Sequence, residues 1–292
     1  MSETRRTCIV THTGCDMPIA TGNQLGIKII PDILMFDGLT FLNGVDLDPV
    51  SFYERLRTAK KLPTSSHPNA EMFLEAFREV AADERFDEIF CITCTSKMSG
   101  TYNTAMLAAR TAAEEGLSIP IYVYDSLWVS HAQRLLVEKA NELAHEGYKS
   151  AHIAGVLEEM RPRITIYIMM ESLKYAYLGG RTGAIQLLAA QYFGIRPVMT
   201  FIEGISHNLA VLRNAREGFR FITKKFKEES EPGQSGIIFH GNDIHRGETL
   251  HRMLLEVNPT ANLRIEDVGP VIGLYGGPNN VGVTYVRPRK PT

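Results

Sequence analysis

The chain has 292 residues, of which 44% are hydrophobic and 22% charged, as is typical of a globular protein with a sizeable core. Its 31 Lys and Arg residues nearly balance its 33 Asp and Glu residues, and a net charge of −2 argues against a general nucleic-acid binder. No apolar run approaches the ~18 residues that span a bilayer, and the start lacks the apolar stretch of a signal peptide. We therefore expect a cytoplasmic protein of about two domains, with no membrane span.

The four cysteines are too few for a disulfide scaffold in a chain of this length. Cys91 and Cys94 have the CxxC spacing of zinc and redox sites. However, they lie in a strand-like run, in which residues three apart point to opposite faces. No second pair of ligands follows to complete a zinc site. We expect buried thiols and no metal.

The first half of the chain alternates predicted strands and helices. In chain order these are a strand at Thr7–Thr11, a strand at Ile27–Ile33, helices at Val50–Lys60 and Ala70–Ala82, a strand at Glu88–Thr93, a helix at Thr101–Glu115, a strand at Ile119–Tyr124 and a helix at Ser130–Glu146. The alternation indicates right-handed βαβ units around a parallel sheet.

The second half has a different order, which includes a hairpin. It is predicted to contain a helix at Ala151–Arg161, a strand at Ile164–Met170, a helix at Ala184–Gln191, strands at Pro197–Ile202 and Ser206–Leu212, a helix at Glu217–Glu229, a strand at Gly236–His240, a helix at Gly247–Val257, and strands at Leu263–Asp267 and Gly282–Val286. Because only Glu203-Gly204 and their neighbours separate two of these strands, they are expected to pair antiparallel.

Hydroxyl side chains follow several of the predicted strands. Thr11 and Thr13 follow the first strand, a run from Thr95 to Thr101 follows the central strand, and Ser126 follows the next. The carboxyl ends of parallel strands form one edge of the sheet, where ligands bind. Hydroxyls and helix N-termini there would suit an anion, although Ser and Thr also serve very often as helix caps. Both interpretations are open at this point.

Common catalytic motifs are absent from the sequence: there is no GxSxG, GxxxxGK[ST], HExxH or GxGxxG pattern. The turn Gly276–Gly282 could cradle a phosphate, but a turn of this composition more often joins two elements. The residues alone therefore predict an α/β protein with a pocket that suits an anion.

Seven blocks along the chain form a more specific pattern. They are CIVTHTGCDMP (Cys8–Pro18), SSHPNAEMFLE (Ser65–Glu75), TSKMSGTYNTA (Thr95–Ala105), YVYDSLWVS (Tyr122–Ser130), LKYAYLGGRTG (Leu173–Gly183), GIRPVM (Gly194–Met199) and GPVIGLYGGPNNVG (Gly269–Gly282). In this order the chain resembles the DegV family of fatty-acid-binding proteins, with SGTY, GGRxG and the closing IGxxxGPxxxG as its most specific elements.

The resemblance implies a two-domain α/β fold. An N-terminal Rossmann-like domain (residues 1–155) with a parallel α/β/α sheet would precede a C-terminal α/β domain (residues 156–292) with a mixed sheet. One long-chain fatty acid would lie between them, its carboxylate held by Ser and Thr hydroxyls. The resemblance also implies a carrier that is not itself an enzyme and needs no cofactor. It would present the acid to a separate ATP-dependent fatty acid kinase subunit, which forms the acyl phosphate.

Site residues follow from the same resemblance. Ser65 falls where the family has the Thr of its TSxPS motif, with Thr64 just before it, and Ser65 is expected to bind the carboxylate. Ser99 is the second expected donor, and Ser96 lies nearby. Arg213 falls where the family has a basic residue associated with kinase recognition, although an ordinary surface arginine is equally compatible with its position.

Two positions depart from the family pattern. His12 stands where the family usually has Asp, and Tyr275 stands where it usually has the His of the closing motif. A phenol can still donate to a carboxylate, and His12 could replace the lost imidazole if the two loops meet. The departures are compatible with a rearranged fatty-acid site or with a different acidic ligand.

Two other functions stay open on the sequence. One is an enzyme that acts on a small carbonyl or acyl-phosphate substrate, with His12, His67 or His240 near the strand ends. The other is a regulatory protein in which a bound lipid serves as the signal.

Overall fold

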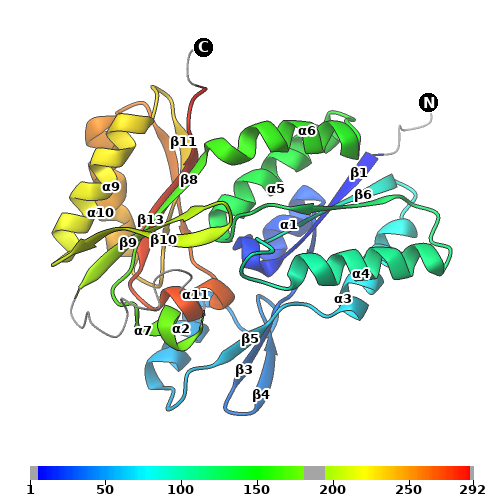
Figure 1. Cartoon of the computed structure of the whole chain (residues 1–292), viewed down its shortest axis with the longest axis horizontal. Helices are drawn as coiled ribbons and strands as arrows, with labels where there is room; N and C mark the ends of the chain where they lie inside the picture. Colours follow the sequence, from blue (N-terminus) through cyan, green and yellow to red (C-terminus); the bar gives the residue numbers. More distant parts are fainter. Residues whose placement is uncertain (1–5, 181–194, 290–292) are drawn as a thin grey trace.

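The computed structural model describes residues 6–180 and 195–289. The N-terminal half contains a four-stranded sheet in the order β2-β1-β6-β7, in which every neighbouring pair is parallel. Its strands are β1 (Arg6–His12), β2 (Lys28–Ile30), β6 (Phe86–Thr93) and β7 (Ile121–Asp125). The predicted βαβ organisation is thereby confirmed (Figure 1).

Helices cover both faces of this sheet, and α1 links its first two strands. The bounds are Ile19–Leu25 for α1, Ala70–Ala81 for α3, Thr101–Glu114 for α4, Ser130–His145 for α5 and Ser150–Met160 for α6. Helix α3 forms because its apolar side chains recur on one face and Asn69 caps its first turn by accepting from the Met72 N–H. Helices α3 and α4 pack together on one face, and α5 and α6 pack on the other.

The C-terminal half contains a six-stranded mixed sheet in the order β10-β9-β8-β13-β11-β12. Its strands are β8 (Ile164–Met169), β9 (Arg196–Ile202), β10 (Ile205–Leu212), β11 (Ser235–His240), β12 (Asn262–Asp267) and β13 (Val281–Val286). The predicted hairpin is present as the antiparallel β9–β10 pair. Helices α9 (Ala215–Glu229) and α10 (Ile244–Val257) cover the outer face.

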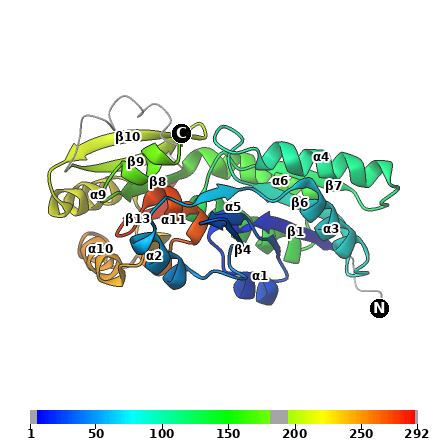
Figure 2. The same ribbon diagram turned by 90° about the horizontal axis from the view of Figure 1, so that it is seen from below.

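The two large sheets share one layer of helices. A single core cluster joins side chains of β1 and β6 to α5 and α6, and continues into Ile164, Ile166 and Phe239 of the second sheet. The sheets lie towards opposite ends of the long axis of the molecule (Figures 1 and 2). The predicted division between residues 155 and 156 falls within α6, in the layer that both sheets contact.

A third, three-stranded sheet corrects one prediction. The strand predicted over residues 27–33, broken by Pro31, is two strands of different sheets: β2 ends before Pro31, and β3 (Ile33–Phe36) enters a separate antiparallel sheet. Pro31 has no N–H with which to continue the parallel ladder. The order of the small sheet is β4-β3-β5, with β4 at Leu39–Leu42 and β5 at Thr64–Ser66.

Short elements near the small sheet were not predicted. They are the 3₁₀ helix η1 (Thr13–Cys15) and the helices α7 (Lys174–Leu178) and α11 (Pro270–Gly276). Another 3₁₀ helix that was not predicted, η2 (Arg161–Arg163), follows α6. Helix α2 (Pro49–Thr58) forms where a helix was expected and packs with α11 on the small sheet. The helix predicted over residues 184–191 lies outside the described residues.

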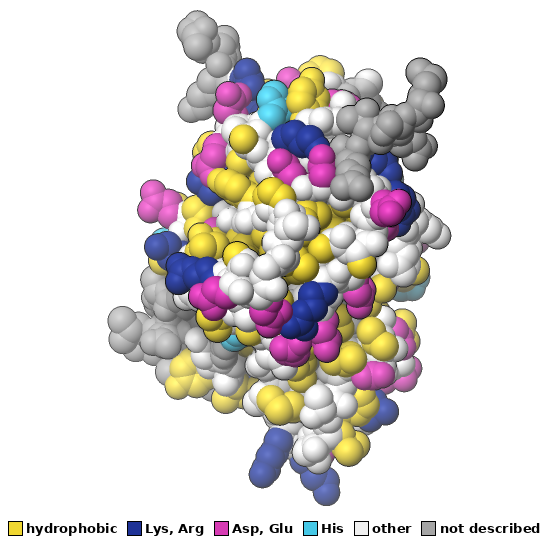
Figure 3. Space-filling view, turned by 90° about the vertical axis from the view of Figure 1, so that its right-hand side faces the viewer, with side chains coloured by type: hydrophobic (Ala, Val, Ile, Leu, Met, Phe, Trp, Pro, Cys, Tyr) yellow, Lys and Arg dark blue, Asp and Glu magenta, His cyan; other side chains and the backbone are white. Residues whose placement is uncertain are grey.

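The surface agrees with the near-neutral composition. On the face shown in Figure 3, basic and acidic side chains are interspersed, without a large patch of either sign. Among the helices of residues 6–180 and 195–289, none has both the length and the apolar character needed to cross a bilayer.

Two glycines should respond in opposite ways to replacement by alanine. A Cβ on Gly282, in the central strand β13, would overlap the carbonyl oxygen of Tyr167 and the ring of Phe239. Gly282→Ala should therefore lower the free energy of unfolding by about 3 kcal/mol or more. A Cβ on Gly155, in α6, would meet open space, and Gly155→Ala should raise the free energy of unfolding by about 1 kcal/mol. Urea denaturation measures both changes, and equal effects would contradict this account of the packing.

Candidate functional site

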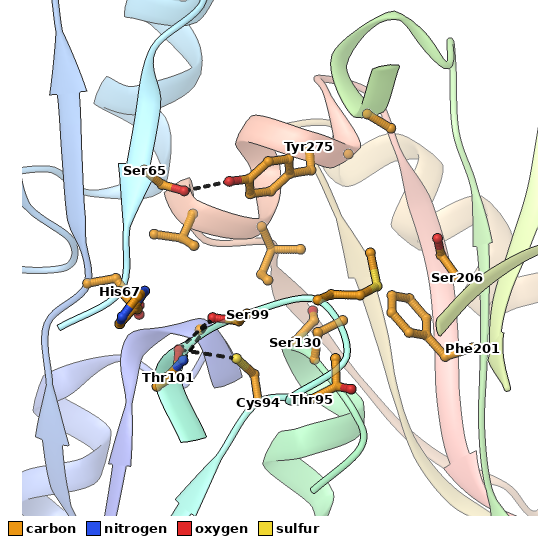
Figure 4. Close-up of a pocket in the computed structure, with 18 of the residues that line it drawn as sticks. Ser65, His67, Cys94, Thr95, Ser99, Thr101, Ser130, Phe201, Ser206 and Tyr275 are labelled. Atoms are coloured by element: carbon orange, nitrogen blue, oxygen red, sulfur yellow. Dashed lines mark hydrogen bonds between the residues drawn. The ribbon is translucent and has the colours of Figure 1, made fainter. Parts of the chain in front are cut away.

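A cavity of about 670 Å³ lies where the carboxyl ends of β1 and β6 meet α11 and the second sheet. Its lining is of two kinds (Figure 4). Hydroxyl-bearing residues come mainly from the loops of the first half, and apolar side chains come mainly from the second. The apolar group includes Ile168, Met170, Leu173, Met199, Phe201 and Phe239.

Ser65 and Tyr275 meet across this cavity. Strand β5 carries Ser65 and α11 carries Tyr275, and the Ser65 Oγ lies 2.6 Å from the Tyr275 Oη. The residues are 210 positions apart in the sequence. The hydrogen bond therefore links the small sheet of the N-terminal half to a helix of the C-terminal half, directly at the cavity wall.

Ser99 belongs to a second group of hydroxyls, just before α4. Its Oγ lies 2.7 Å from the Thr101 Oγ1 and accepts from the Thr101 N–H at 3.3 Å. The Cys94 thiol donates to the same Thr101 Oγ1 at 3.6 Å. With the thiol as donor, the Thr101 hydroxyl can donate to Ser99, which leaves the Ser99 proton available for a ligand.

His12 lines the cavity but is already committed. Its Nδ1 lies 2.9 Å from the Asp32 Oδ2, and its Nε2 accepts from the Cys94 N–H at 3.1 Å. The Gly14 N–H also points at the Nδ1, at 3.2 Å. Both ring nitrogens have partners within the protein, so His12 is poorly placed to bind a ligand directly.

The other predicted residues separate into two groups. Ser96 lines the cavity, and its N–H donates to the Asp125 Oδ1 at 3.1 Å. Thr64 and Arg213 are exposed and do not line the cavity. Thr64 precedes Ser65 in strand β5, where successive side chains point to opposite faces.

The cavity also holds residues outside the predicted fatty-acid site, of which His67 was named only for the alternative enzymatic function. His67 lines it close to Gly100, and the His67 Nε2 lies 2.9 Å from the Thr104 Oγ1. Ser130 and Ser206 line it as well. Ser130 follows a predicted strand by several residues, a spacing that could have directed attention to it. Ser206 carries no such signal, because its position depends on how the β9–β10 hairpin folds over the cavity.

A buried carboxylate supports this wall. The Asp16 Oδ2 accepts from the Ser130 hydroxyl at 2.6 Å, and its Oδ1 accepts from the Gly269 N–H at 3.0 Å. Burial raises the pKa of Asp16 from 3.8 to about 7, although both hydrogen bonds act in the opposite direction. Asp16 and Ser130 both have left-handed backbone conformations, with φ of 54° and 56°. Non-glycine residues rarely adopt this region, and here the hydrogen bonds hold them in it.

Among residues 6–180 and 195–289, no group of three or more His, Cys, Asp and Glu side chains is placed so that it could hold a metal ion. The four cysteines are buried, unpaired thiols. Cys91 lies in the core beneath α3 and α4, whereas Cys94 reaches the cavity.

Comparisons with known proteins agree on one family. A family model described as "Uncharacterised protein, DegV family" matches residues 6–288. A DegV domain-containing protein of Halalkalibacterium halodurans is 28% identical over 279 residues, which cover 95% of this chain and 97% of the relative.

Solved structures show the same fold. A DegV family protein of Thermus thermophilus described by its fatty acid binding is similar with a TM-score of 0.87 and 24% identity, covering 96% of this chain and 99% of that one. A stearic-acid-binding protein of Eubacterium ventriosum is similar with a TM-score of 0.86 and 24% identity, and the match covers 96% of this chain and 97% of that one. A DegV family protein of Eubacterium eligens loaded with heptadecanoic acid is similar with a TM-score of 0.83 and 22% identity, and the match covers 96% of this chain and 99% of that one.

Asp16 should make stability depend on pH. The unfolded chain ionises this group near 3.8 and the folded chain near 7, so its contribution to stability is full at low pH and decreases as pH rises through this window. Asp16→Asn removes the titration. Its free energy of unfolding relative to the wild type should therefore increase by about 4 kcal/mol between pH 4 and pH 8. Chemical denaturation across this range measures the difference, and parallel curves would show that Asp16 does not titrate in this way.

Proposed function

Since this chain belongs to the DegV family, we propose that it binds one long-chain fatty acid in the cavity between its two large sheets. The observation that carries the proposal is the two-part lining of a single cavity, with hydroxyls on one side and an apolar wall on the other. Its volume of about 670 Å³ lies within the range of pockets that hold small molecules. The fatty acids bound by the similar Eubacterium proteins support the choice of ligand.

The carboxylate lies at Ser65, Ser99 and Tyr275 in this proposal. Each residue can donate a hydroxyl proton to an anion, and a hydrogen bond to a charged group is worth about 1.5–3 kcal/mol. Among the described residues that line the cavity there is no Lys or Arg. Neutral donors near the start of α4 can stabilise the anion without the desolvation of a buried counter-charge.

The acyl chain lies against the apolar side of the cavity. Two methionines, Met170 and Met199, contribute to this wall beside Phe201 and Phe239. Methionine side chains adapt their shape to a flexible ligand, and burial of each methylene group contributes about 0.8 kcal/mol. The tail therefore supplies most of the affinity and the hydroxyl group fixes the orientation.

We further propose that the protein acts as a carrier and not as the catalyst. It would present the bound carboxylate to a separate ATP-dependent kinase subunit, as the family resemblance implies. Arg213, exposed just after β10, is a candidate contact for that partner.

Removal of the two serine hydroxyls should weaken fatty-acid binding. Ser65→Ala with Ser99→Ala loses two charge-assisted hydrogen bonds, so the Kd for octadecanoic acid should rise by about a hundredfold or more. Thr64→Val is the matched control, because Thr64 neighbours Ser65 and does not line the cavity. Native mass spectrometry and titration measure the loading. A double variant that binds as tightly as the wild type would mean that the carboxylate lies elsewhere, and a protein that cannot be loaded at all would overturn the carrier function.

Arg213 should matter only when the kinase is present. Arg213→Glu should slow acyl-phosphate formation by a cognate kinase at least about tenfold through charge repulsion, while fatty-acid binding stays unchanged. Arg57→Glu, on the exposed side of α2, serves as the control for a general charge effect. Equal rates for the two variants would remove Arg213 from the contact.

A further inference from the structure

The tip of the β9–β10 hairpin covers part of the apolar side of the cavity. Met199 and Phe201 of β9 line the cavity, and the hairpin extends from the second sheet towards the first (Figure 1). Among the described residues, β8 pairs with β9 only as far as Met199, which lies opposite Ile168, and β10 is the edge strand of the sheet. Residues 200–207, which we call the strap, therefore have strand pairing only within the hairpin itself.

A bulge lies where the strap begins. The register of the β9–β10 pair shifts between Asn208 and Ala210, and Asn208 lies opposite Met199. A bulge interrupts the ladder of hydrogen bonds and bends the strand that carries it. At the far end of the strap, Ile202 and Ile205 pair with each other and are 50% and 37% exposed. Segments with few buried apolar contacts open locally more easily than a core strand does, so the strap can bend away from the cavity at the bulge.

A buried hydrogen bond attaches the strap to the first half of the chain. The hydroxyl of Thr95, a fully buried residue, donates to the Gly204 carbonyl oxygen at 2.9 Å. The contact is close, since a Cβ on Gly204 would overlap the Thr95 Oγ1. The same Oγ1 accepts from the Lys97 N–H at 3.2 Å, and the Thr95 carbonyl oxygen accepts from the Ser99 N–H at 3.2 Å. Thr95 therefore joins the strap to the loop that holds the Ser99 hydroxyl.

From this arrangement we infer that the strap lifts to admit and release the ligand, and that the Thr95–Gly204 hydrogen bond is the latch that holds it closed. The inference rests on the proposed fatty-acid function and concerns the exchange of that ligand. Thr95 is a positioning residue, because the latch acts on the backbone of Gly204 and needs no contact with the acyl chain. The latch is closed both before and after loading, so it sets the rates of binding and release and leaves their ratio nearly unchanged.

Thr95→Val tests the latch, because it replaces the hydroxyl by a methyl group. Loss of one hydrogen bond should raise the association and dissociation rate constants together, each about fivefold to tenfold, while the Kd stays nearly unchanged. Stopped-flow mixing with a fluorescent 18-carbon fatty acid measures association. Displacement of the bound probe by excess octadecanoic acid measures dissociation.

Two further variants separate the latch from a general loss of stability. Thr95→Ser keeps a hydroxyl at this position and should exchange its ligand at the rates of the wild type. Thr93→Val is the matched control, because the Thr93 Oγ1 in β6 also donates to a backbone carbonyl, that of Tyr124 at 3.3 Å. Thr93 is buried and does not line the cavity, so this variant should also keep the rates of the wild type.

Gly204→Ala tests the same contact from the side of the strap. Its Cβ would overlap the Thr95 Oγ1, so this variant should also raise both rate constants. Gly233→Ala is its control, because Gly233 has a similar positive φ, 77° against 82°, but open space at its Cβ. If Thr95→Val does not fold, the comparison of these two glycine variants decides.

The outcomes distinguish the two proposals. If the variants at Thr95 and Gly204 exchange the ligand no faster than their controls do, the latch is overturned and fatty-acid binding stands. The same conclusion follows if only dissociation becomes faster and the Kd rises in proportion, because the hydrogen bond would then stabilise the loaded form alone. If the wild type binds neither the probe nor octadecanoic acid, the proposed function itself is overturned.

Discussion

The Asp16 carboxylate joins three elements that lie far apart in the sequence. It sits after the short helix η1, accepts from Ser130 at the start of α5, and accepts from the Gly269 N–H at the start of α11. The fit is close, since a Cβ on Gly269 would lie 2.6 Å from the Asp16 Oδ1. Because α5 brings Ser130 and α11 brings Tyr275 to the cavity, its wall depends on this carboxylate. The hydrogen bonds offset part of the cost of burying a group that can carry charge.

The buried acidic group beside the cavity, Asp32, is hydrogen-bonded within the protein. Asp32 receives hydrogen bonds from His12 and Thr13, at 2.9 and 2.8 Å, which occupies its Oδ2. The acidic side chain is therefore less repulsive towards an incoming carboxylate than an unpaired one would be. Ser65 and Ser99 remain as neutral donors. A near-neutral chain can thus hold an anion, because hydroxyl dipoles and the start of α4 supply the positive potential.

The elements with clear periodicity could be predicted from the sequence, and those defined by distant contacts could not. The amphipathic pattern of α3 and the apolar run of β6 fix their structure locally, so their bounds differ from prediction by two residues or fewer. Strands β3 and β5 have four and three residues, and each is defined by pairing with the other across some thirty positions. Similarly, Ser65 and Ser99 belong to recognisable motifs. The commitment of His12 to Asp32 depends on a contact 20 residues away, which the motif does not contain.

The hydrogen bond between Tyr275 and Ser65 bears on how the proposed carboxylate would bind. The Tyr275 Oη and the Ser65 Oγ lie 2.6 Å apart at the wall of the cavity, where one hydroxyl donates to the other. A carboxylate has two acceptor oxygens and no proton, so it can accept from both hydroxyls only if the one that donates to the other turns its proton to the ligand. Entry of the ligand then replaces one neutral hydrogen bond by two charge-assisted ones, and rotation of two hydroxyls suffices. Helix α11 and strand β5 stay bridged in either state, through each other or through the ligand. In the proposed function, the carboxylate would therefore bind and leave without separation of α11 from the small sheet.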